Sequence, residues 1–512
     1  MHSTISGLFL AASFNALLWI VLIPIWQYPD EQAHFGQLQN IAEFGSSAPN
    51  PFKNTSQEIS LSEVILQTER DSFGNNKFTY HPEYKLTYTA GLYGPEENTI
   101  RQLPLSSRKE LIKWEATVNP PLYYTFGAFA YRALYNFSLF ERVYAARFIS
   151  LFLFTSTIFV VYKIAQIIFL KNNYLKVALP ATIAFMPMFV FASTGVLPDP
   201  LTNLFFTLII YFCLRVFNFG LSIATVFSLI LITILGFFTR QQFLISIPII
   251  LFASAMYFLR QKQFKKLLAL ILISIAGVII FSQKILIPEI GYLKSSSLTN
   301  QNFFYYFIWT IRHSISEVLP WYWGVYKWLS LTVPHINYQI INRLVIIAIF
   351  GILIKFFLVI KNRKMTTLDV NLIFLITISL FYFLIFALWD FLFNRQSGFS
   401  FGIQGRYFFP QIAAHMSILL IGLWQIFEIF LRGFAKYGIF LLIVSMVIFN
   451  AISLTFVSAS YYDISSLSVF VTQASQYKPL FFKGNIILAL ITFVLLSQGL
   501  FIFKLLRHII RK

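Results

Sequence analysis

The sequence contains few charged residues for its length. Only 12% of its 512 residues are Asp, Glu, Lys or Arg, whereas about 25% is usual for a soluble globular domain. Acidic residues are the scarcest, with 20 Asp and Glu against 39 Lys and Arg. A chain this poor in charge cannot present a surface that mostly faces water, so an ordinary soluble protein is excluded.

The sequence contains only one cysteine, and it lacks two common catalytic signatures. The single cysteine, Cys213, lies in an apolar run, which excludes an intramolecular disulfide and predicts a buried thiol. The sequence has no GxxxxGK[ST] phosphate-binding loop and no HExxH zinc motif; in "DEQAH" an aspartate, Asp30, stands where that motif needs its first histidine. A P-loop NTPase and a zinc protease of that type are therefore not expected.

Apolar runs dominate what is present. Hydrophobic residues make up 57% of the chain and the mean hydropathy is +0.70. Many runs reach the roughly 18–20 apolar residues that cross a bilayer. We predict an all-α integral membrane protein with about 11–13 transmembrane helices. The twelve predicted spans are 5–27, 146–169, 177–196, 201–217, 221–238, 243–260, 267–287, 341–360, 370–390, 407–428, 437–457 and 485–506.

The formal charge of +19 is explained by where the basic residues lie. They form short clusters between the apolar runs, as the positive-inside rule predicts for cytoplasmic loops, and no cluster is interleaved with aromatics in the way of a nucleic-acid-binding surface. We expect a multi-pass protein of the plasma (inner) membrane with both termini cytoplasmic, a retained first helix and no nucleic-acid partner. The clusters are 171–176, 260–266, 361–364, 432–436 and 504–512.

The opposite, outer face receives the polar segments. We expect one polytopic membrane domain, 1–512, with a large first outer loop at 28–145 and a second at 288–340. The end of the first loop, 119–136, is apolar but interrupted by Arg132, which favours a helix lying in the membrane interface over another span.

Three ionisable residues follow the first span directly. Pro29 suits the first turn of a helix, so Asp30 and Glu31 would lie at a helix N-terminus, with His34 on the same face. Such a group can act as a general base, orient a nucleophile or contribute to a divalent metal site. Stabilisation of the helix dipole is the alternative role for the two acids.

Five motifs on the predicted outer face carry a resemblance to known proteins. They are "PDEQAHF" (29–35), "NPPLYY" (119–124), "LPDPLTN" (197–203), "WYWGVYKW" (321–328) and "QGRYFFP" (404–410). In this order they resemble a large family of predicted bacterial membrane proteins with Pro-Asp-Glu-x-x-His near the start. The chain is more distantly similar to GT-C glycosyltransferases, such as protein mannosyltransferases and the aminoarabinose transferases of lipid A.

The resemblance implies a GT-C-like fold and an inverting transfer of a sugar from a polyprenyl-phosphate donor to a lipid, glycan or protein acceptor. It also implies that the acid of the first outer loop, Asp30 here with Glu31 beside it, is the catalytic base or helps to hold a metal. One position departs from related sequences, which often carry His before the two prolines where this chain has Asn119.

Arginines on the same face could stabilise the leaving lipid phosphate, because a guanidinium matches phosphate oxygens with a planar fork. Arg406 is the first candidate and Arg240 the second, with snorkelling to the interface as the alternative. Asp199 is either a turn residue or a second acid. We expect the acceptor or cavity residues to be Asp199, Asn119, Tyr123, Gln404 and Trp321. His313 and Glu317, four residues apart, fit a helix-face pair.

Two other classes of function stay open. A transporter or flippase of lipid-linked sugars also has about twelve spans, but this chain shows no internal repeat and few acids at the span centres. A polymerase or ligase of surface polysaccharide, or an inactive scaffold, is the third class.

Overall fold

Long apolar helices make up most of the computed structural model, which describes residues 2–71, 74–115, 118–281, 303–398, 400 and 402–510. Within these residues, nine helices are long and apolar enough to cross a membrane. The predicted all-helical membrane class is therefore confirmed. They are α1 (His2–Leu22), α6 (Leu139–Ile168), α9 (Asp199–Phe219), α11 (Ser246–Arg260) with the preceding η2 (Gln241–Ile245), α16 (His335–Asn362), α17 (Thr367–Ser397), α18 (Ile412–Phe430) with the preceding η5 (Gly405–Gln411), α19 (Ala435–Tyr461) and α21 (Ile486–Ile510).

Shorter helices occupy the remaining predicted spans: α7 (Leu175–Ala184), α8 (Pro187–Ala192), α10 (Ile223–Phe237) and α12 (Phe264–Phe281). The prediction of one continuous span at 177–196 is wrong. Pro187 lacks a backbone N–H and disfavours helical geometry at the residue before it, and Met186 is accordingly extended, with φ −75° and ψ 109°. The predicted span 267–287 coincides with α12 as far as residue 281, and the end of that predicted span lies outside the described residues.

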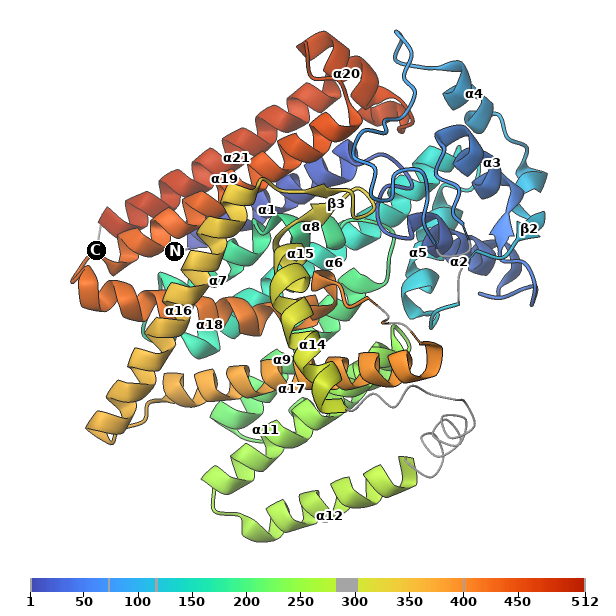
Figure 1. Ribbon diagram of the computed structural model, residues 1–512. Helices are drawn as coiled ribbons and strands as arrows, with labels where there is room; N and C mark the ends of the chain where they lie inside the picture. Colours follow the sequence, from blue (N-terminus) through green and yellow to red (C-terminus); the bar gives the residue numbers. More distant parts are fainter. Residues whose placement is uncertain are drawn as a thin grey trace.

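The first outer loop folds into short elements packed beside the bundle (Figure 1, right). Strands β1 and β2 pair antiparallel, with Thr55 opposite Lys113. Helix α5, at 12 residues, is too short to cross a bilayer, as expected for an interfacial helix. The elements are α2 (Glu31–Phe44), β1 (Thr55–Ser56), α3 (Gln57–Leu66), α4 (Pro95–Arg101), η1 (Leu105–Arg108), β2 (Leu111–Lys113) and α5 (Leu122–Ala133).

The later outer segments pack against this loop. Nζ of Lys327 donates hydrogen bonds to the carbonyls of Pro82 and Tyr84 in the loop (2.8 and 2.5 Å), and Nε1 of Trp328 donates to the carbonyl of Trp26 just before the loop (3.1 Å). Of the predicted second outer loop, 288–302 lies outside the described residues. The elements are α14 (Phe303–His313), η4 (Ser314–Val318), α15 (Leu319–Trp323), β3 (Val325–Tyr326), β4 (Leu331–Thr332), α20 (Leu467–Ser475) and η6 (Leu480–Phe482).

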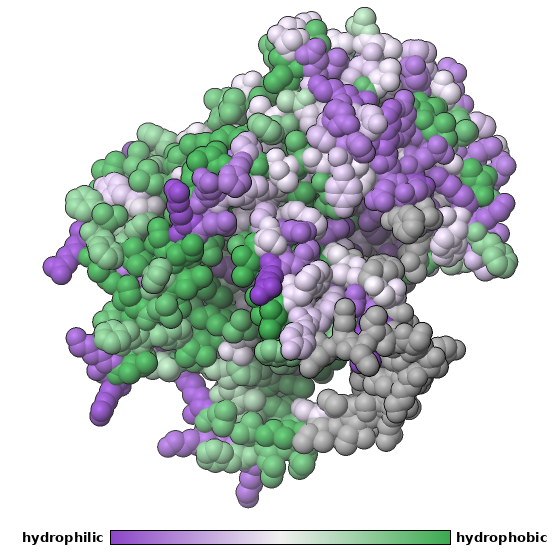
Figure 2. All heavy atoms as spheres, in the orientation of Figure 1, coloured by the Kyte–Doolittle hydropathy of each residue, from purple (hydrophilic) through white to green (hydrophobic). Residues whose placement is uncertain are grey.

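Polar and apolar surfaces are separated along the molecule. In Figure 2, hydrophobic side chains cover the helical bundle, whereas hydrophilic ones gather over the first outer loop and at the opposite helix ends. The N- and C-termini lie close together at the end of the bundle away from that loop (Figure 1). An apolar band between two polar ends is the surface expected of a membrane-spanning protein.

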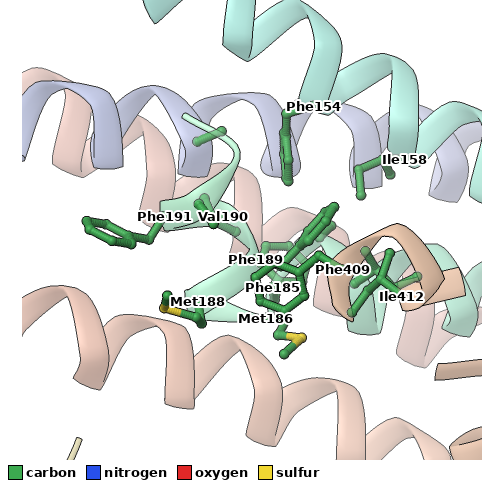
Figure 3. Packing of buried hydrophobic residues seen from close by; sticks show 14 of the residues in the cluster. Phe154, Ile158, Phe185, Met186, Met188, Phe189, Val190, Phe191, Phe409 and Ile412 are labelled. Carbon is green, nitrogen blue, oxygen red and sulfur yellow. The ribbon is translucent and has the colours of Figure 1, made fainter. Parts of the chain in front are cut away.

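The broken span lies at the centre of the packing (Figure 3). Phe189 of α8 meets Phe409 of η5 edge to face, with ring centroids 5.3 Å apart. Gly405 of η5 touches α15 so closely that a Cβ there would lie 2.2 Å from the backbone nitrogen of Tyr322. Only glycine allows this approach. These contacts fix η5, and with it Arg406, against the core.

Candidate active site

The acidic segment after α1 makes a sharp turn before α2 begins. Asp30 is the N-cap of α2 and adopts left-handed backbone angles, φ 56° and ψ 20°. This region is sparsely populated by residues other than glycine, although Asp and Asn tolerate it best. The helix starts at Glu31, as Pro29 predicts, and the two neighbouring acids then separate.

Glu31 points into the protein and is completely buried. Its Oε1 and Oε2 accept from Nε and Nη2 of Arg147 at 2.8 and 2.6 Å, and they also accept from the backbone N–H groups of Val196 and Trp26 (3.2 and 3.0 Å). The expectation that Glu31 shares one face with Asp30 and His34 is therefore wrong. The buried Arg147 attracts this carboxylate into the core and uses up its acceptor sites.

Asp30 faces the other way, and 40% of its side chain is exposed. Its Oδ1 lies 2.6 Å from Nη1 of Arg70, and its Oδ2 lies 3.9 Å from Nη2 of Arg406. Arg70 is held in turn by Glu115, with Nε and Oε1 2.9 Å apart. The carboxylate is thus oriented by one guanidinium and approached by a second, while part of it stays open to solvent.

Two further predicted residues form an ion pair close enough to His34 for their charges to act on it. Asp199 begins α9, and Arg240 lies in the turn between α10 and η2. Nη1 of Arg240 donates to Oδ1 of Asp199. Four separated segments therefore contribute to what we call the acid–arginine cluster: Asp30, His34, Asp199, Arg240 and Arg406.

His34 lies among these charges. Its Nδ1 is 2.8 Å from the hydroxyl of Tyr124. Burial lowers the pKa of His34 from its ordinary value of 6.5 to about 4, an effect that the negative charges of Asp30 and Asp199 oppose and that the nearby arginines reinforce. The imidazole is therefore neutral at physiological pH and can both donate and accept a hydrogen bond.

Arg406 has the least saturated guanidinium of the cluster. Its side chain is only 8% exposed, and it lies over the ring of Tyr407, 5.5 Å from the centroid. Among the described residues, its Nε has no hydrogen-bond partner. An unsatisfied buried donor on a cation is costly, so this position favours an anionic ligand.

The residues predicted for the acceptor or cavity fall into two groups. Gln404 and Trp321 lie where η5 contacts α15, beside Gly405. Asn119 precedes α5, and its backbone N–H and carbonyl bond the amide of Gln37 (3.0 and 2.5 Å). All three lie on elements next to the acid–arginine cluster.

The side chain of Tyr123 is buried, and it supports neighbouring segments by hydrogen bonds instead of lining a cavity. Its hydroxyl lies 3.0 Å from the hydroxyl of Ser150 and accepts from the N–H of Leu197 at 3.1 Å. Through Leu197 it fixes the turn that places Asp199.

The predicted helix-face pair of His313 and Glu317 is present, with Nδ1 of His313 and Oε2 of Glu317 3.5 Å apart.

Sequence reasoning missed Arg70, Glu115, Tyr124 and Arg147. Arg70 and Glu115 belong to the irregular first loop, where neither hydropathy nor spacing distinguishes them. Tyr124 could have been predicted from the sequence, because it ends the "NPPLYY" motif and the imidazole of His34 needed a hydrogen-bond partner. The charge of Arg147, placed inside a predicted span, was also a signal, since such charges are costly unless they are paired.

Metal ligation by Asp30 and Glu31 together does not fit this arrangement, because their carboxylates diverge and Glu31 is saturated by Arg147 and two N–H groups. Within the described part of the chain, no group of three or more His, Cys, Asp or Glu side chains is placed to hold a metal ion.

Comparison with solved structures found matches at low sequence identity. The archaeal oligosaccharyltransferase AglB from Archaeoglobus fulgidus, in complex with an inhibitory peptide and a dolichol-phosphate, is 13% identical, with a TM-score of 0.45 over 90% of this chain and 56% of that chain. The apo form of the Archaeoglobus fulgidus oligosaccharyltransferase gives 14% identity and a TM-score of 0.42 over the same shares. The chain thus spans about half the length of these structures.

Sequence comparison points to one family. No curated protein matches the sequence. The family model described as "Predicted membrane protein (DUF2142)" matches residues 14–415, a region that contains the whole acid–arginine cluster together with Arg70 and Tyr124. The chain belongs to this DUF2142 family of predicted membrane proteins.

Proposed function

We propose that the protein is a membrane glycosyltransferase that moves a sugar from a polyprenyl-phosphate donor to a hydroxyl-bearing acceptor at the outer membrane surface. One observation carries this proposal: the partly exposed carboxylate of Asp30 lies 3.9 Å from Arg406, whose Nε is buried without a hydrogen-bond partner. A base and an anion-binding cation thus lie side by side at one end of the bundle.

The proposed reaction needs both groups. Asp30 takes the proton from the acceptor hydroxyl as that oxygen forms its bond to the anomeric carbon of the sugar. The bond from that carbon to the phosphate oxygen breaks, and the lipid phosphate leaves with the bonding electrons. Attack from the face opposite the leaving group inverts the configuration. Glu31 takes no part in this step, because its carboxylate is turned to Arg147.

The negative charge that develops on the leaving phosphate would be stabilised by arginine. Arg406 is better placed for this than Arg240, because Arg240 is already paired with Asp199. The neutral His34, close to both ion pairs, would donate or accept a hydrogen bond to the sugar. Arg70 acts on the reaction only through Asp30, so we treat it as a positioning residue.

An apolar groove near Arg406 fits the hydrocarbon chain of such a donor. Its volume is about 510 Å³, and it opens between α15, α16, α17 and α18. Among the described residues, its lining contains no Asp, Glu, Lys or Arg. Phe408 of η5 lines the groove two positions after Arg406. A lipid chain lying in the groove would therefore bring its phosphate towards the arginine.

Binding of defined lipids to the purified protein tests the proposal. Undecaprenyl phosphate serves as the donor analogue and undecaprenol, which lacks the phosphate, as its control; bound lipid is measured by native mass spectrometry. Arg406→Gln should weaken phosphate-lipid binding about tenfold or more, because hydrogen bonds to charged groups contribute roughly 1.5–3 kcal/mol. Arg406→Lys should weaken it less. The matched control is Arg432→Gln, at an exposed arginine beyond the end of α18.

Binding of the hydrocarbon chain and binding of the phosphate of the donor should be weakened by different substitutions. Leu380, which lines the groove and is exposed, can be replaced by Trp to narrow it. Leu380→Trp should weaken the binding of both lipids, whereas Arg406→Gln should leave undecaprenol unaffected. Equal binding of undecaprenyl phosphate by wild type and Arg406→Gln would contradict the assignment of Arg406.

The arrangement favours an enzyme over a transporter of lipid-linked sugars. Asp30, Asp199 and Arg406 all lie at the ends of helices or in the turns that join them, whereas transporters hold their substrates near the middle of the membrane.

A further inference from the structure

A polar pocket lies at the end of the bundle opposite the acid–arginine cluster. Its volume is about 370 Å³, and it forms where the turn between α6 and α7 meets the end of α18, the start of α19 and the end of α21. Arg406 lies in η5, which leads directly into α18; that helix is 19 residues long and so extends about 28 Å. That length matches the hydrocarbon thickness of a bilayer. We call this hollow the far-end pocket.

Charges of both signs line the far-end pocket without pairing. Lys171 and Lys436 contribute two cations and Glu428 contributes a carboxylate. Among the described residues, none of the three forms an ion pair within 4.0 Å. The lysines therefore offer free ammonium groups to an anion, while Glu428 offers a free carboxylate to a cation.

Two aromatic residues of the pocket point to the same kind of ligand. Tyr174 is only 3% exposed, and its buried hydroxyl has no hydrogen-bond partner among the described residues. Trp424 lines the pocket beside Glu428, one helical turn away. A tyrosine hydroxyl can donate to a phosphate oxygen, and an indole ring attracts an ammonium group. Tyrosine and tryptophan are also typical of the membrane–water boundary.

The ligand that combines these features is a zwitterionic phospholipid head group. We infer that the far-end pocket binds a phosphoethanolamine head group from the membrane leaflet at that end of the bundle. The phosphodiester lies against Lys171 and Lys436, and the primary ammonium lies against Glu428 and Trp424. A phosphatidylglycerol head group would satisfy the lysines but leave Glu428 unpaired. A quaternary choline group could not donate hydrogen bonds to that carboxylate.

Lipid binding can be measured directly on the full chain. Protein purified in detergent is titrated with phosphatidylethanolamine, phosphatidylglycerol and phosphatidylcholine of identical acyl chains, and bound lipids are counted by native mass spectrometry. The wild type should retain one phosphatidylethanolamine in preference to the other two lipids. The double variant Lys171→Gln/Lys436→Gln should weaken its binding about tenfold or more, since each basic residue at a membrane surface attracts lipid phosphate appreciably.

The variant Glu428→Gln tests the contribution of the lipid amine separately from that of the phosphate. This variant should bind phosphatidylglycerol as well as phosphatidylethanolamine, because the amine has lost its carboxylate partner. The matched control is Lys361→Gln/Lys364→Gln, which removes two exposed lysines, one from the end of α16 and one from the turn that follows it, outside the pocket; it should bind like the wild type. A wild type without preference for phosphatidylethanolamine, or a Lys171→Gln/Lys436→Gln variant that binds like the wild type, would overturn the inference. All variants sit near the surface, and an unchanged thermal midpoint shows that they fold.

Discussion

Oδ2 of Asp30 and Nη2 of Arg406 lie 3.9 Å apart, although one residue follows the first membrane helix and the other precedes α18. The first outer loop meets the later helices at this point. Arg70 holds the other oxygen of Asp30 from within that loop. The proposed base is therefore positioned by two separate parts of the chain.

The ion pair of Glu31 and Arg147 should be essential for folding. Glu31→Gln leaves the buried guanidinium of Arg147 without its counter-charge, and breaking a buried pair in this way costs about 3–5 kcal/mol. Asp30→Asn should cost about 1 kcal/mol or less, because partly exposed pairs contribute little. Thermal unfolding in detergent compares the two variants. Equal losses of stability would contradict the assignment of Glu31 to the core and Asp30 to the surface.

His34 should make the stability of the protein depend on pH. Its pKa is lowered to about 4 in the folded chain, so between pH 6.5 and 4 the unfolded chain binds a proton that the folded chain does not. Stability due to this group is therefore complete above pH 6.5 and declines as the pH falls towards 4. The drop in thermal midpoint from pH 7.5 to 5.0 should be smaller in His34→Gln than in the wild type. His81→Gln, at an exposed histidine, is the control and should behave like the wild type; an unchanged drop in His34→Gln would refute the prediction.

The two polar ends of the molecule should lie on opposite sides of the membrane. Both termini lie at one end of the bundle and the first outer loop at the other (Figure 1). A reporter that is active only outside the cytoplasm should work when fused after Gly45 and fail when fused after Lys262, in the basic turn between α11 and α12. A fusion at the C-terminus should also fail. The reverse pattern would invert the topology and place the acid–arginine cluster in the cytoplasm.

The sequence was sufficient for the membrane class and for the gathering of most predicted residues, although nine helices of the described part of the chain are long and apolar enough to span, against twelve predicted spans. Hydropathy located the membrane helices because length and apolarity alone determine which segments can cross a bilayer. Basic clusters then placed Asp30, Asp199, Arg240 and Arg406 at one surface, where the structure brings them together. Their chemical roles remain predictions. The break at Pro187 was also readable, but its uniformly apolar surroundings favoured a continuous span.

Contacts between side chains that are far apart in the sequence could not be predicted from the sequence. Asp30 and Glu31 are neighbours with the same charge, and tertiary partners, above all Arg147 in α6, determine which of them turns inwards. Arg70 reaches Asp30 through the fold of an irregular loop that has no periodic pattern. The orientation of each acid therefore depends on tertiary contacts, which hydropathy and local spacing do not record.

The most direct test of the proposed function is a comparison of surface glycans and glycolipids by mass spectrometry. Strains that lack the gene are complemented with the wild type, with Asp30→Asn or with Glu110→Gln, a matched control at an exposed acid of the same loop. The proposed function predicts that one glycan is missing from the deletion strain and from the Asp30→Asn strain, and that wild type and Glu110→Gln both restore it, with equal amounts of all three proteins in the membrane. Restoration by Asp30→Asn, or identical glycans with and without the gene, would contradict it.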